Sequence, residues 1–174
     1  ANSTVLTGST QHPGGYHTAT DTTMSVVNVA GFTGSYGSAG GEILSLKRIT
    51  NQGFKTEYVM VQSASRNNPS HATDFSGKLY VSRSYGVGIT GATGTPSESL
   101  GDSPSAGQTY SGSQVIVSTG RLNTGFIRLN ANPNDTTTPY IDIVERTGSN
   151  IYDTQLKARL GDLSGLANSG PVSA

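Results

Sequence analysis

The sequence predicts an all-β protein, an antiparallel β-sandwich or jelly roll with long loops rich in Gly, Ser and Thr. Three observations predict this class: charged residues make up only 13% of the chain, 23 of the 174 residues are glycine, and hydrophobic residues reach only 33%. Chains of low hydrophobicity are often disordered, but disordered chains usually carry a high net charge. Because the net charge here is zero, many short strands joined by small-residue loops are the better interpretation.

The first half of the chain predicts an N-terminal segment and then strands separated by turns. Residues 1–23 are polar, have no sustained period, and predict an arm or linker. A β-branched, apolar run begins at Met24 and is followed by a glycine-rich loop. Residues 55–65 are apolar on both faces at their centre, as a core strand of a sandwich is. The predicted strands are 24–30, 42–50, 55–65 and 78–86.

The second half begins with an excursion, residues 87–110, that is nearly all Gly, Ser, Thr and Pro. Its length and composition predict a long surface loop. No segment has a helical period, and the only candidate for a short helix is 160–166. We therefore expect a β-sandwich domain over 24–166 and a C-terminal tail or linker over 167–174. The predicted strands of this half are 113–120, 125–131, 139–148 and 151–160.

The densest group of charges lies in the last two of these strands, which are predicted to form a hairpin. Residues 151–160 show the clearest two-residue period in the chain, which predicts apolar side chains facing in and polar side chains facing out. In the preceding strand, Ile141 and Ile143 share one side, and Asp142 and Arg146 share the other. We therefore interpret the charges as a solvated sheet face rather than a catalytic site: Asp142, Glu145, Asp153, Lys157 and Arg159.

No group of residues has the pattern of a catalytic centre, so the sequence predicts that the protein is not an enzyme and uses no cofactor. Asp142 with Glu145 or Asp153 comes nearest to a glycosidase carboxylate pair, but the three-residue spacing of Asp142 and Glu145 in a strand directs those two to opposite faces. The chain has no nucleophile elbow and no HExxH motif. We interpret the three histidines, His12, His17 and His71, as polar loop residues.

Residues 131–139 form an oxygen-rich loop with two interpretations. Asn132, Asn134 and Asp135 are weak candidates for Ca²⁺ ligands, because carboxylate and amide oxygens bind this ion. The same residues make an ordinary Asx-rich turn. We favour the turn, because Asp135 is the one carboxylate among these candidate ligands.

Three tyrosines beside Gly/Ser-rich segments are the candidate ligand-binding residues. Tyr36, Tyr85 and Tyr110 combine a flat apolar ring with a polar tip, which suits contact with sugars or proteins. Tyr85 and Tyr110 also flank the excursion at residues 87–110, the largest candidate recognition loop. The alternative is that this excursion is a surface connection that orders against a neighbouring subunit.

The composition also bears on the partners of the protein. A net charge of zero provides no electrostatic footprint for nucleic acid. No apolar stretch approaches the roughly 20 residues that cross a bilayer, so membrane insertion is not expected. Because apolar residues are few, the core is limited, and we expect self-association, as a homotrimer, to supplement it.

Three segments resemble tail-fibre and tail-tip proteins of tailed bacteriophages, particularly phages of aquatic bacteria. They read TDFSGKLYVSRSYG, TYSGSQVIVSTGRLNTGFIRLNANPNDTTTPYIDIVERTG and IYDTQLKARLGDLSGL, and the resemblance covers roughly 41–166. It implies a virion structural protein located on the extracellular particle and involved in host attachment through a cell-surface glycan or protein. It also implies a trimer that contacts other virion proteins and belongs to a longer polypeptide, which would account for the absence of a starting Met.

The resemblance carries no catalytic signature, and two alternatives from other functional classes remain open. One is a carbohydrate-binding module or adhesin domain of a bacterial surface protein, since such proteins share the bias toward Ser, Thr, Asn and Gly. The other is a capsule-degrading depolymerase module, since some fibres cleave the glycan that they bind.

Overall fold

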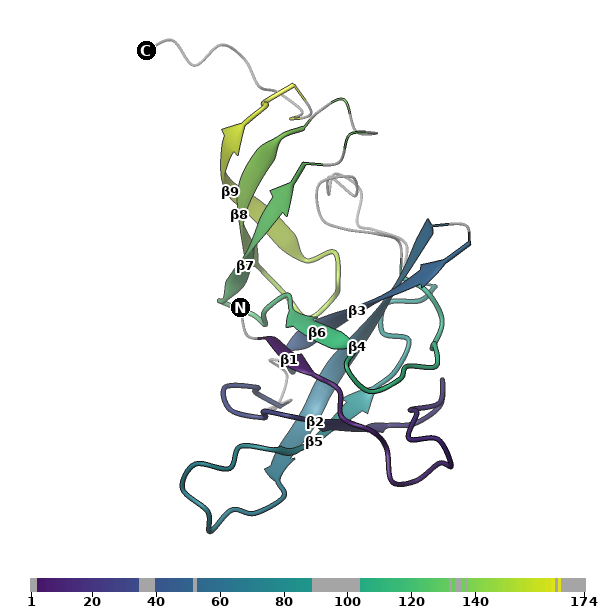
Figure 1. Ribbon diagram of the computed structural model, residues 1–174. Helices are drawn as coiled ribbons and strands as arrows, with labels where there is room; N and C mark the ends of the chain where they lie inside the picture. Colours follow the sequence, from purple (N-terminus) through teal and green to yellow (C-terminus); the bar gives the residue numbers. More distant parts are fainter. Residues whose placement is uncertain are drawn as a thin grey trace.

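The all-β prediction is confirmed. A computed structural model describes residues 3–34, 40–51, 53–88, 104–131, 133, 136, 138–164 and 166. In these residues every paired strand is antiparallel and no helix occurs (Figure 1). The strands are β1 (Ser3–Val5), β2 (Thr23–Val26), β3 (Ile43–Thr50), β4 (Gly53–Arg66), β5 (Gly77–Ser82), β6 (Val115–Ser118), β7 (Gly125–Asn130), β8 (Tyr140–Arg146) and β9 (Thr154–Gly161).

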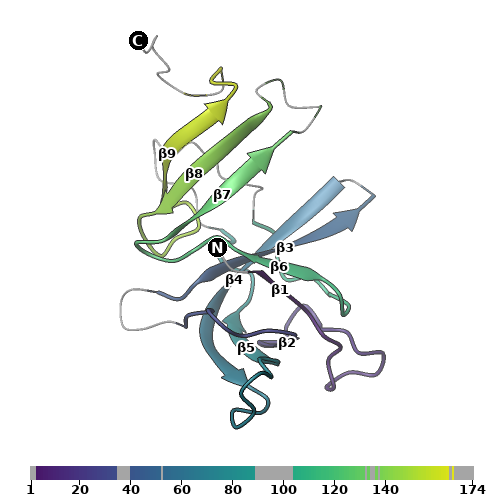
Figure 2. The ribbon, with the colours of Figure 1, turned by 60° about the vertical axis from the view of Figure 1, so that its left-hand side comes forward.

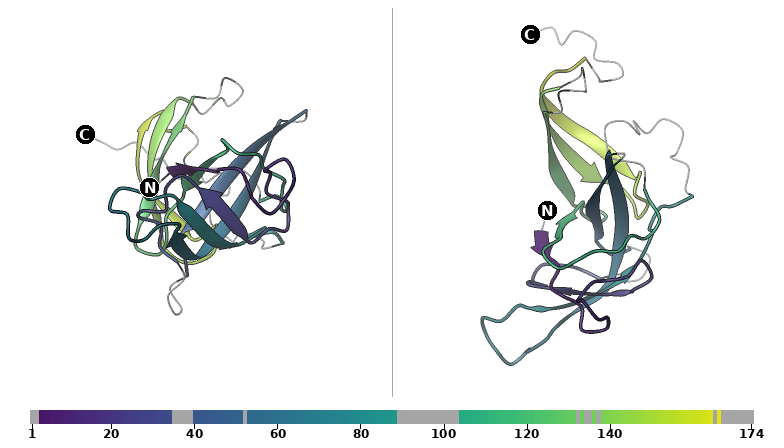
Figure 3. Two further views of the ribbon diagram at one scale, coloured as in Figure 1. Left: turned by 60° about the horizontal axis from the view of Figure 1, so that its bottom comes forward. Right: turned by 45° about the vertical axis from the view of Figure 1, so that its right-hand side comes forward.

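The larger of the two sheets curls into a nearly closed barrel. Its six strands follow the order β1-β6-β3-β4-β5-β2. The two edge strands meet at a bridge between Leu6 and Val26, and Val27 N donates to Val5 O across the same seam. Closure of this kind removes exposed sheet edges. The remaining strands form a separate sheet, β7-β8-β9, which rises from one end of the barrel (Figures 1 and 3).

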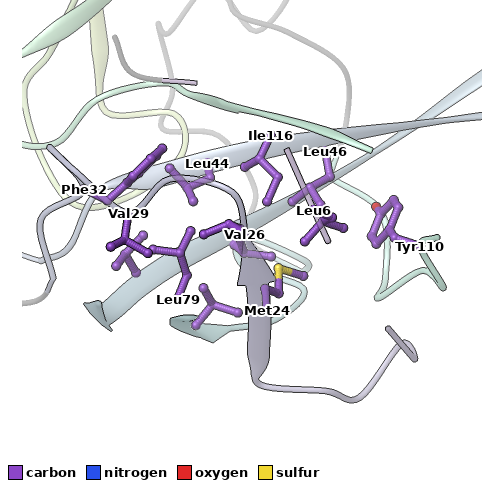
Figure 4. Packing of buried hydrophobic residues seen from close by; sticks show 13 residues of the cluster. Leu6, Met24, Val26, Val29, Phe32, Leu44, Leu46, Leu79, Tyr110 and Ile116 are labelled. Carbon is purple, nitrogen blue, oxygen red and sulfur yellow. The ribbon is translucent and has the colours of Figure 1, made fainter. Parts of the chain in front are cut away.

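The barrel interior holds the main hydrophobic core (Figure 4). Alternate residues of each strand point inward, so a chain with few apolar residues still fills a small barrel. On β3 these are Leu44 and Leu46, with Ser45 between them only partly buried. The cluster is Leu6, Met24, Val26, Val29, Phe32, Leu44, Leu46, Val59, Val61, Leu79, Val81, Tyr110 and Ile116.

The N-terminal segment is part of the barrel, and the prediction of an arm or linker over 1–23 is wrong for the residues that the structure describes there, 3–23. Strand β1 pairs with β6, the side chain of Leu6 lies in the core, and His17 is fully buried. The sequence did not indicate this role because β1 is only three residues long, too short for a two-residue period to be visible.

The hairpin of β3 and β4 projects beyond the barrel (Figure 2). Strand β6 pairs with β3 only at Leu44–Leu46, and β5 pairs with β4 only from Met60 onward. Farther out, β3 and β4 pair only with each other among the described strands, apart from an isolated bridge between Thr56 and Pro104. The outer part of the hairpin is therefore a two-stranded ribbon.

The three-stranded sheet is fastened to the barrel through the β8–β9 turn. Ile151 packs with Ile43 and Tyr58 in a second apolar cluster. Arg146 is buried beside it, where Nε donates to Thr119 O at 3.0 Å and Nη1 donates to Asn150 O at 2.8 Å. Burial lowers the pKa of Arg146 to about 10, so the side chain stays charged at neutral pH. A cation satisfied by carbonyl oxygens thus joins the two sheets.

Candidate functional site

The charged segment that stood out in the sequence is divided between the two faces of the small sheet. The prediction of a solvated face fits Glu145 and Lys157, which form a partly exposed ion pair. It is wrong for Asp142, which is 0% exposed, and for Arg159, whose side chain is 3% exposed. Asp153 caps the turn by accepting a hydrogen bond from Asn150 N. The apolar and polar sides of β8 are therefore the reverse of the prediction.

The ion pair between Asp142 and Arg159 allows this polar side of β8 to be buried. Arg159 donates from Nε and Nη2 to the two carboxylate oxygens of Asp142 at 2.6 and 2.8 Å. The same guanidinium stacks on Tyr140, with Cζ 3.6 Å from the ring centroid. Bidentate pairing and cation–π contact satisfy both charges away from water. A two-residue period indicates that a strand has two faces, but it does not indicate which face is buried when the polar residues can pair.

The opposite face of this sheet exposes a continuous aliphatic surface. In the strand register, Leu129, Ile141 and Leu160 lie side by side in one row. Ile127 and Ile143 lie side by side in the next row, with the exposed Ala158. Leu129 is 75% exposed and Leu160 is 73% exposed. We call these five large side chains, Ile127, Leu129, Ile141, Ile143 and Leu160, the aliphatic face.

A surface of this kind has a functional meaning. Single exposed apolar residues are normal, whereas contiguous apolar patches mark contacts with other macromolecules. Burying one Ile or Leu side chain fully contributes about 1.5–3 kcal/mol. The border of the aliphatic face carries the ion pair of Glu145 and Lys157, which has no net charge. The aliphatic face therefore has the apolar centre and polar rim of a protein–protein interface.

A second exposed apolar group lies at the end of the projecting hairpin. Ile49 on β3 and Phe54 on β4 are cross-strand partners, and they are 76% and 64% exposed. The next rung inward pairs Arg48 with Lys55, two exposed cations directly opposite each other. We call the residues Arg48, Ile49, Phe54 and Lys55 the hairpin tip. No sequence signal pointed to it: Arg48, Ile49 and Lys55 lie in predicted strands and Phe54 lies between them, but nothing in the sequence shows that the two strands extend beyond their neighbours.

Of the three tyrosines predicted to bind a ligand, the two that the structure describes, Tyr85 and Tyr110, do not form a shared surface. Tyr110 is 2% exposed and lies in the barrel core, so its ring has no face available to a sugar, contrary to the prediction. Burial and the neighbouring Glu57 raise its pKa. Tyr85 packs against the cluster of Ile43, and its hydroxyl donates to Ser149 O at 2.6 Å. Tyr36 lies outside the described residues.

The last residues of the predicted recognition loop, 104–110, are held by hydrogen bonds to the barrel. Residues 89–103 lie outside the described part of the chain, but 104–110 are tied to the barrel. Ser105 N donates to Thr56 O, and Gly107 N donates to Ser84 Oγ, both at 2.8 Å. His17 and Tyr110 exchange backbone hydrogen bonds at 2.8 and 2.9 Å. The C-terminal part of the excursion, residues 104–110, is therefore bound to the side of the barrel.

A buried ion pair explains why that segment is fixed. Glu57 is fully buried and accepts hydrogen bonds from Arg83 Nε and Nη2 at 2.7 and 2.9 Å. It also accepts from Gln108 N at 2.9 Å, while Arg83 Nη1 donates to the carbonyls of Thr18 and Asp21. Because both side chains are engaged on all sides, this pair joins three segments of backbone and does not present a reactive group.

The predicted metal candidates receive no support from the described residues. Within the part of the chain that the structure describes, no three His, Asp or Glu side chains come together. The weak Ca²⁺ candidates Asn132, Asn134 and Asp135 lie outside it. His12 pairs with Asp21 at 3.0 Å. His17 Nε2 donates to Thr7 O at 3.0 Å.

The pair of His12 and Asp21 predicts a pH dependence of stability. Burial alone would raise the pKa of the Asp21 carboxyl, but hydrogen bonds from His12, Thr18 Oγ1 and Thr18 N outweigh it and lower the pKa to about 2. A depressed carboxyl pKa stabilises the fold above the unfolded value near 3.8, and this stabilisation is lost as pH falls toward 2.

We therefore expect the free energy of unfolding to fall between pH 4 and pH 2, with this carboxyl contributing on the order of 1 kcal/mol. Urea titrations followed by circular dichroism at several pH values check this. In Asp21→Asn the part of the fall due to this carboxyl should disappear. An identical pH profile for the two proteins would show that Asp21 does not contribute.

Comparisons with known proteins do not assign the chain to a family. The sequence matches no protein-family model, no curated protein and no solved structure. No helix in the described residues is long and apolar enough to cross a membrane. Two apolar surfaces, the aliphatic face and the hairpin tip, and the resemblance of the sequence segments are therefore the features that point to a function.

Proposed function

We propose that this chain is a virion structural protein, a tail-fibre or tail-tip module of a tailed bacteriophage that forms a homotrimer and takes part in host attachment. The identification with phage tails depends on the sequence segments that resemble such proteins. The observation that supports a structural, assembling role is the aliphatic face of the β7-β8-β9 sheet. A module that works as one part of a particle has its exposed apolar surface covered by other subunits.

Two properties favour covering by copies of the same chain. The net charge is zero, so identical copies do not repel one another over long range. The border of the aliphatic face is a closed ion pair between Glu145 and Lys157, which does not select a partner of opposite charge. The barrel surfaces away from this face remain for contacts with other virion proteins and with a glycan or protein on the host surface.

The contacts of the three buried carboxylates in the described residues, Glu42, Glu57 and Asp142, support a role other than catalysis. Glu57 and Asp142 are both bound by arginine in bidentate pairs. Glu42 is buried, accepts from Ser118 Oγ through one oxygen and accepts from Thr33 N through the other. Each of these buried carboxylates thus has a structural partner, and no two of them face each other across an open cleft as glycosidase carboxylates do.

Replacing two residues of the aliphatic face is expected to weaken self-association. In Leu129→Thr/Leu160→Thr both changed side chains are mostly exposed, so the fold loses little, and threonine keeps a high strand propensity. We expect the dissociation constant of the assembly to rise by about 30-fold or more, as for interface hot spots. Sedimentation velocity over a concentration series measures it.

The control for this experiment is Val115→Thr/Val117→Thr, which removes exposed apolar side chains from β6. Those residues lie on the barrel, away from the aliphatic face, and their replacement should leave the assembly unchanged. If both double variants associate like the wild type, the aliphatic face does not hold the copies together.

Virion membership has a separate test. Purified particles of a phage that encodes this sequence should contain its peptides by mass spectrometry, in a ratio of three copies for each fibre or tip. An antibody against the isolated chain should also reduce adsorption of the phage to host cells. Peptides found only in the soluble lysate, and never in particles, would contradict the proposal.

A further inference from the structure

A hollow lies where the barrel meets the β7-β8-β9 sheet. It has a volume of about 260 Å³ and is lined by residues that precede β3 and by the segment that leads from β6 into β7. Figure 1 shows this connecting segment at the junction of the two sheets. Two of the lining residues are charged, Glu42 and Arg121. The hollow therefore brings an acidic and a basic side chain to one place on the surface.

The carboxylate of Glu42 lies at the wall of this hollow. Its Oε2 accepts from Thr33 N at 3.1 Å, and its Oε1 accepts from Ser118 Oγ, which itself accepts from Gly120 N at 3.0 Å. Thr33 and Gly120 both line the hollow. The Glu42 residue is only 6% exposed. Because each carboxylate oxygen has more than one lone pair, these two hydrogen bonds leave room for a further donor.

Glu42 differs from the other buried carboxylates of the described residues, because it has no counter-charge. Glu57 and Asp142 are bound by Arg83 and Arg159. All 11 Lys and Arg residues of the chain belong to the described part, and none of them forms an ion pair with Glu42. Burying a carboxylate is costly unless a cation neutralises it. The position of Glu42 therefore favours a cationic group that enters the hollow from outside the chain.

Arg121 is the second charge of the hollow, and it is not neutralised either. In the part of the chain that the structure describes, its guanidinium has no ion pair and no hydrogen bond, since the bonds of this residue run through its backbone N and O. A guanidinium binds a carboxylate through two parallel hydrogen bonds. Glu42 and Arg121 are not joined to each other, so together they are complementary to a ligand that carries both signs of charge.

We propose that the hollow binds a small zwitterion of the α-amino acid class, with its ammonium group on Glu42 and its carboxylate on Arg121. The ammonium group supplies the counter-charge that the buried carboxylate lacks, and the guanidinium fixes the other end of the ligand. This inference does not rest on the proposed self-association, because no residue of the aliphatic face lines the hollow.

Titration of ¹⁵N-labelled protein with the free amino acid L-alanine tests the site. The backbone amide signals of Gly120, Arg121 and Gly125 should shift, with a dissociation constant on the order of millimolar, since a ligand of this size makes few contacts. Ethylammonium and propionate, which carry one charge each, should bind at least about tenfold more weakly. Sodium chloride keeps the ionic strength equal in all titrations, because salt screens charges.

Two variants examine the two ends of the site. Glu42→Gln keeps the local hydrogen bonds, because an amide oxygen can accept from Thr33 N and an amide nitrogen can donate to Ser118 Oγ. It should weaken L-alanine binding by about tenfold or more. Arg121→Gln should weaken L-alanine equally but should not weaken ethylammonium. The matched control is Asp21→Asn, whose carboxylate binds His12 outside the hollow. This control should bind L-alanine like the wild type.

Thermal melting of Glu42→Gln without ligand gives a second readout. This variant should melt at least as high as the wild type, because it no longer buries a charge that lacks a counter-charge. A variant that melts lower or does not fold would show that the charge stabilises the chain unaided, and would overturn the proposal. Wild-type amide signals that ignore L-alanine would also overturn it, as would an unchanged dissociation constant in either variant. Ethylammonium that binds as tightly as L-alanine would contradict the role of Arg121.

Discussion

Arg83→Met is expected to lower the free energy of unfolding by about 3–5 kcal/mol, the usual cost of removing one partner of a buried ion pair. The change leaves the carboxylate of Glu57 without its counter-charge at a position that is fully buried. It also removes the donor that reaches the carbonyls of Thr18, Asp21 and Gln108. Because folded domains are stable by only about 5–15 kcal/mol, this loss is large.

Urea unfolding followed by far-ultraviolet circular dichroism measures the effect of Arg83→Met. The control is Lys78→Met, which removes an exposed cation from β5 and should change the free energy of unfolding by less than about 0.5 kcal/mol. An Arg83→Met protein as stable as this control would mean that the pair does not hold the barrel segments together.

The second large effect is expected on the small sheet. Asp142→Asn removes the negative charge beside Arg159, whose guanidinium is buried against the ring of Tyr140. An unpaired buried cation is expected to cost about 3–5 kcal/mol. Because Asp142 lies at the centre of β8, the sheet that carries the aliphatic face should open first, and self-association should weaken together with stability.

The same strand offers a matched control for Asp142→Asn. Glu145→Gln also removes one carboxylate charge from an ion pair, but the side chains of Glu145 and Lys157 are 36% and 47% exposed. Surface pairs of this kind contribute less than about 1 kcal/mol. Hydrogen exchange of the β8 amides should therefore accelerate strongly in Asp142→Asn and little in Glu145→Gln. Equal protection in the two variants would contradict the structural role of the buried pair.

Much of the fold could be predicted from the sequence, because strand formation depends on local composition and turns. The predicted strand 55–65 corresponds to β4 (Gly53–Arg66), and 139–148 corresponds to β8 (Tyr140–Arg146). The segments that follow these two strands contain Gly, Asn and Ser, whose backbone preferences favour turns whatever the rest of the fold. The closure of the larger sheet into a barrel was not predictable in this way, since it depends on contacts between β1 and β2, at the two edges of that sheet.

The functional surfaces were harder to predict, because they depend on which side of a strand is covered. The sequence predicts the alternation around Asp142 correctly, but it predicts the wrong side of the strand to be buried. The deciding factor is the pairing of Asp142 with Arg159 and the stacking on Tyr140, which join residues on adjacent strands. Tyr110 was predicted to be exposed because Gly and Ser surround it in sequence, yet its ring completes the core. Local composition does not reveal contacts between residues that lie far apart in the sequence.

Light scattering of the purified wild-type protein at micromolar concentration tests the proposed self-association most directly, because it gives the mass in solution. We expect an assembly of three chains of 17.9 kDa each, held by the aliphatic face. A protein that has the mass of one chain throughout the concentration range would contradict it, because the exposed Ile and Leu side chains of β7, β8 and β9 would then have no partner of their own kind.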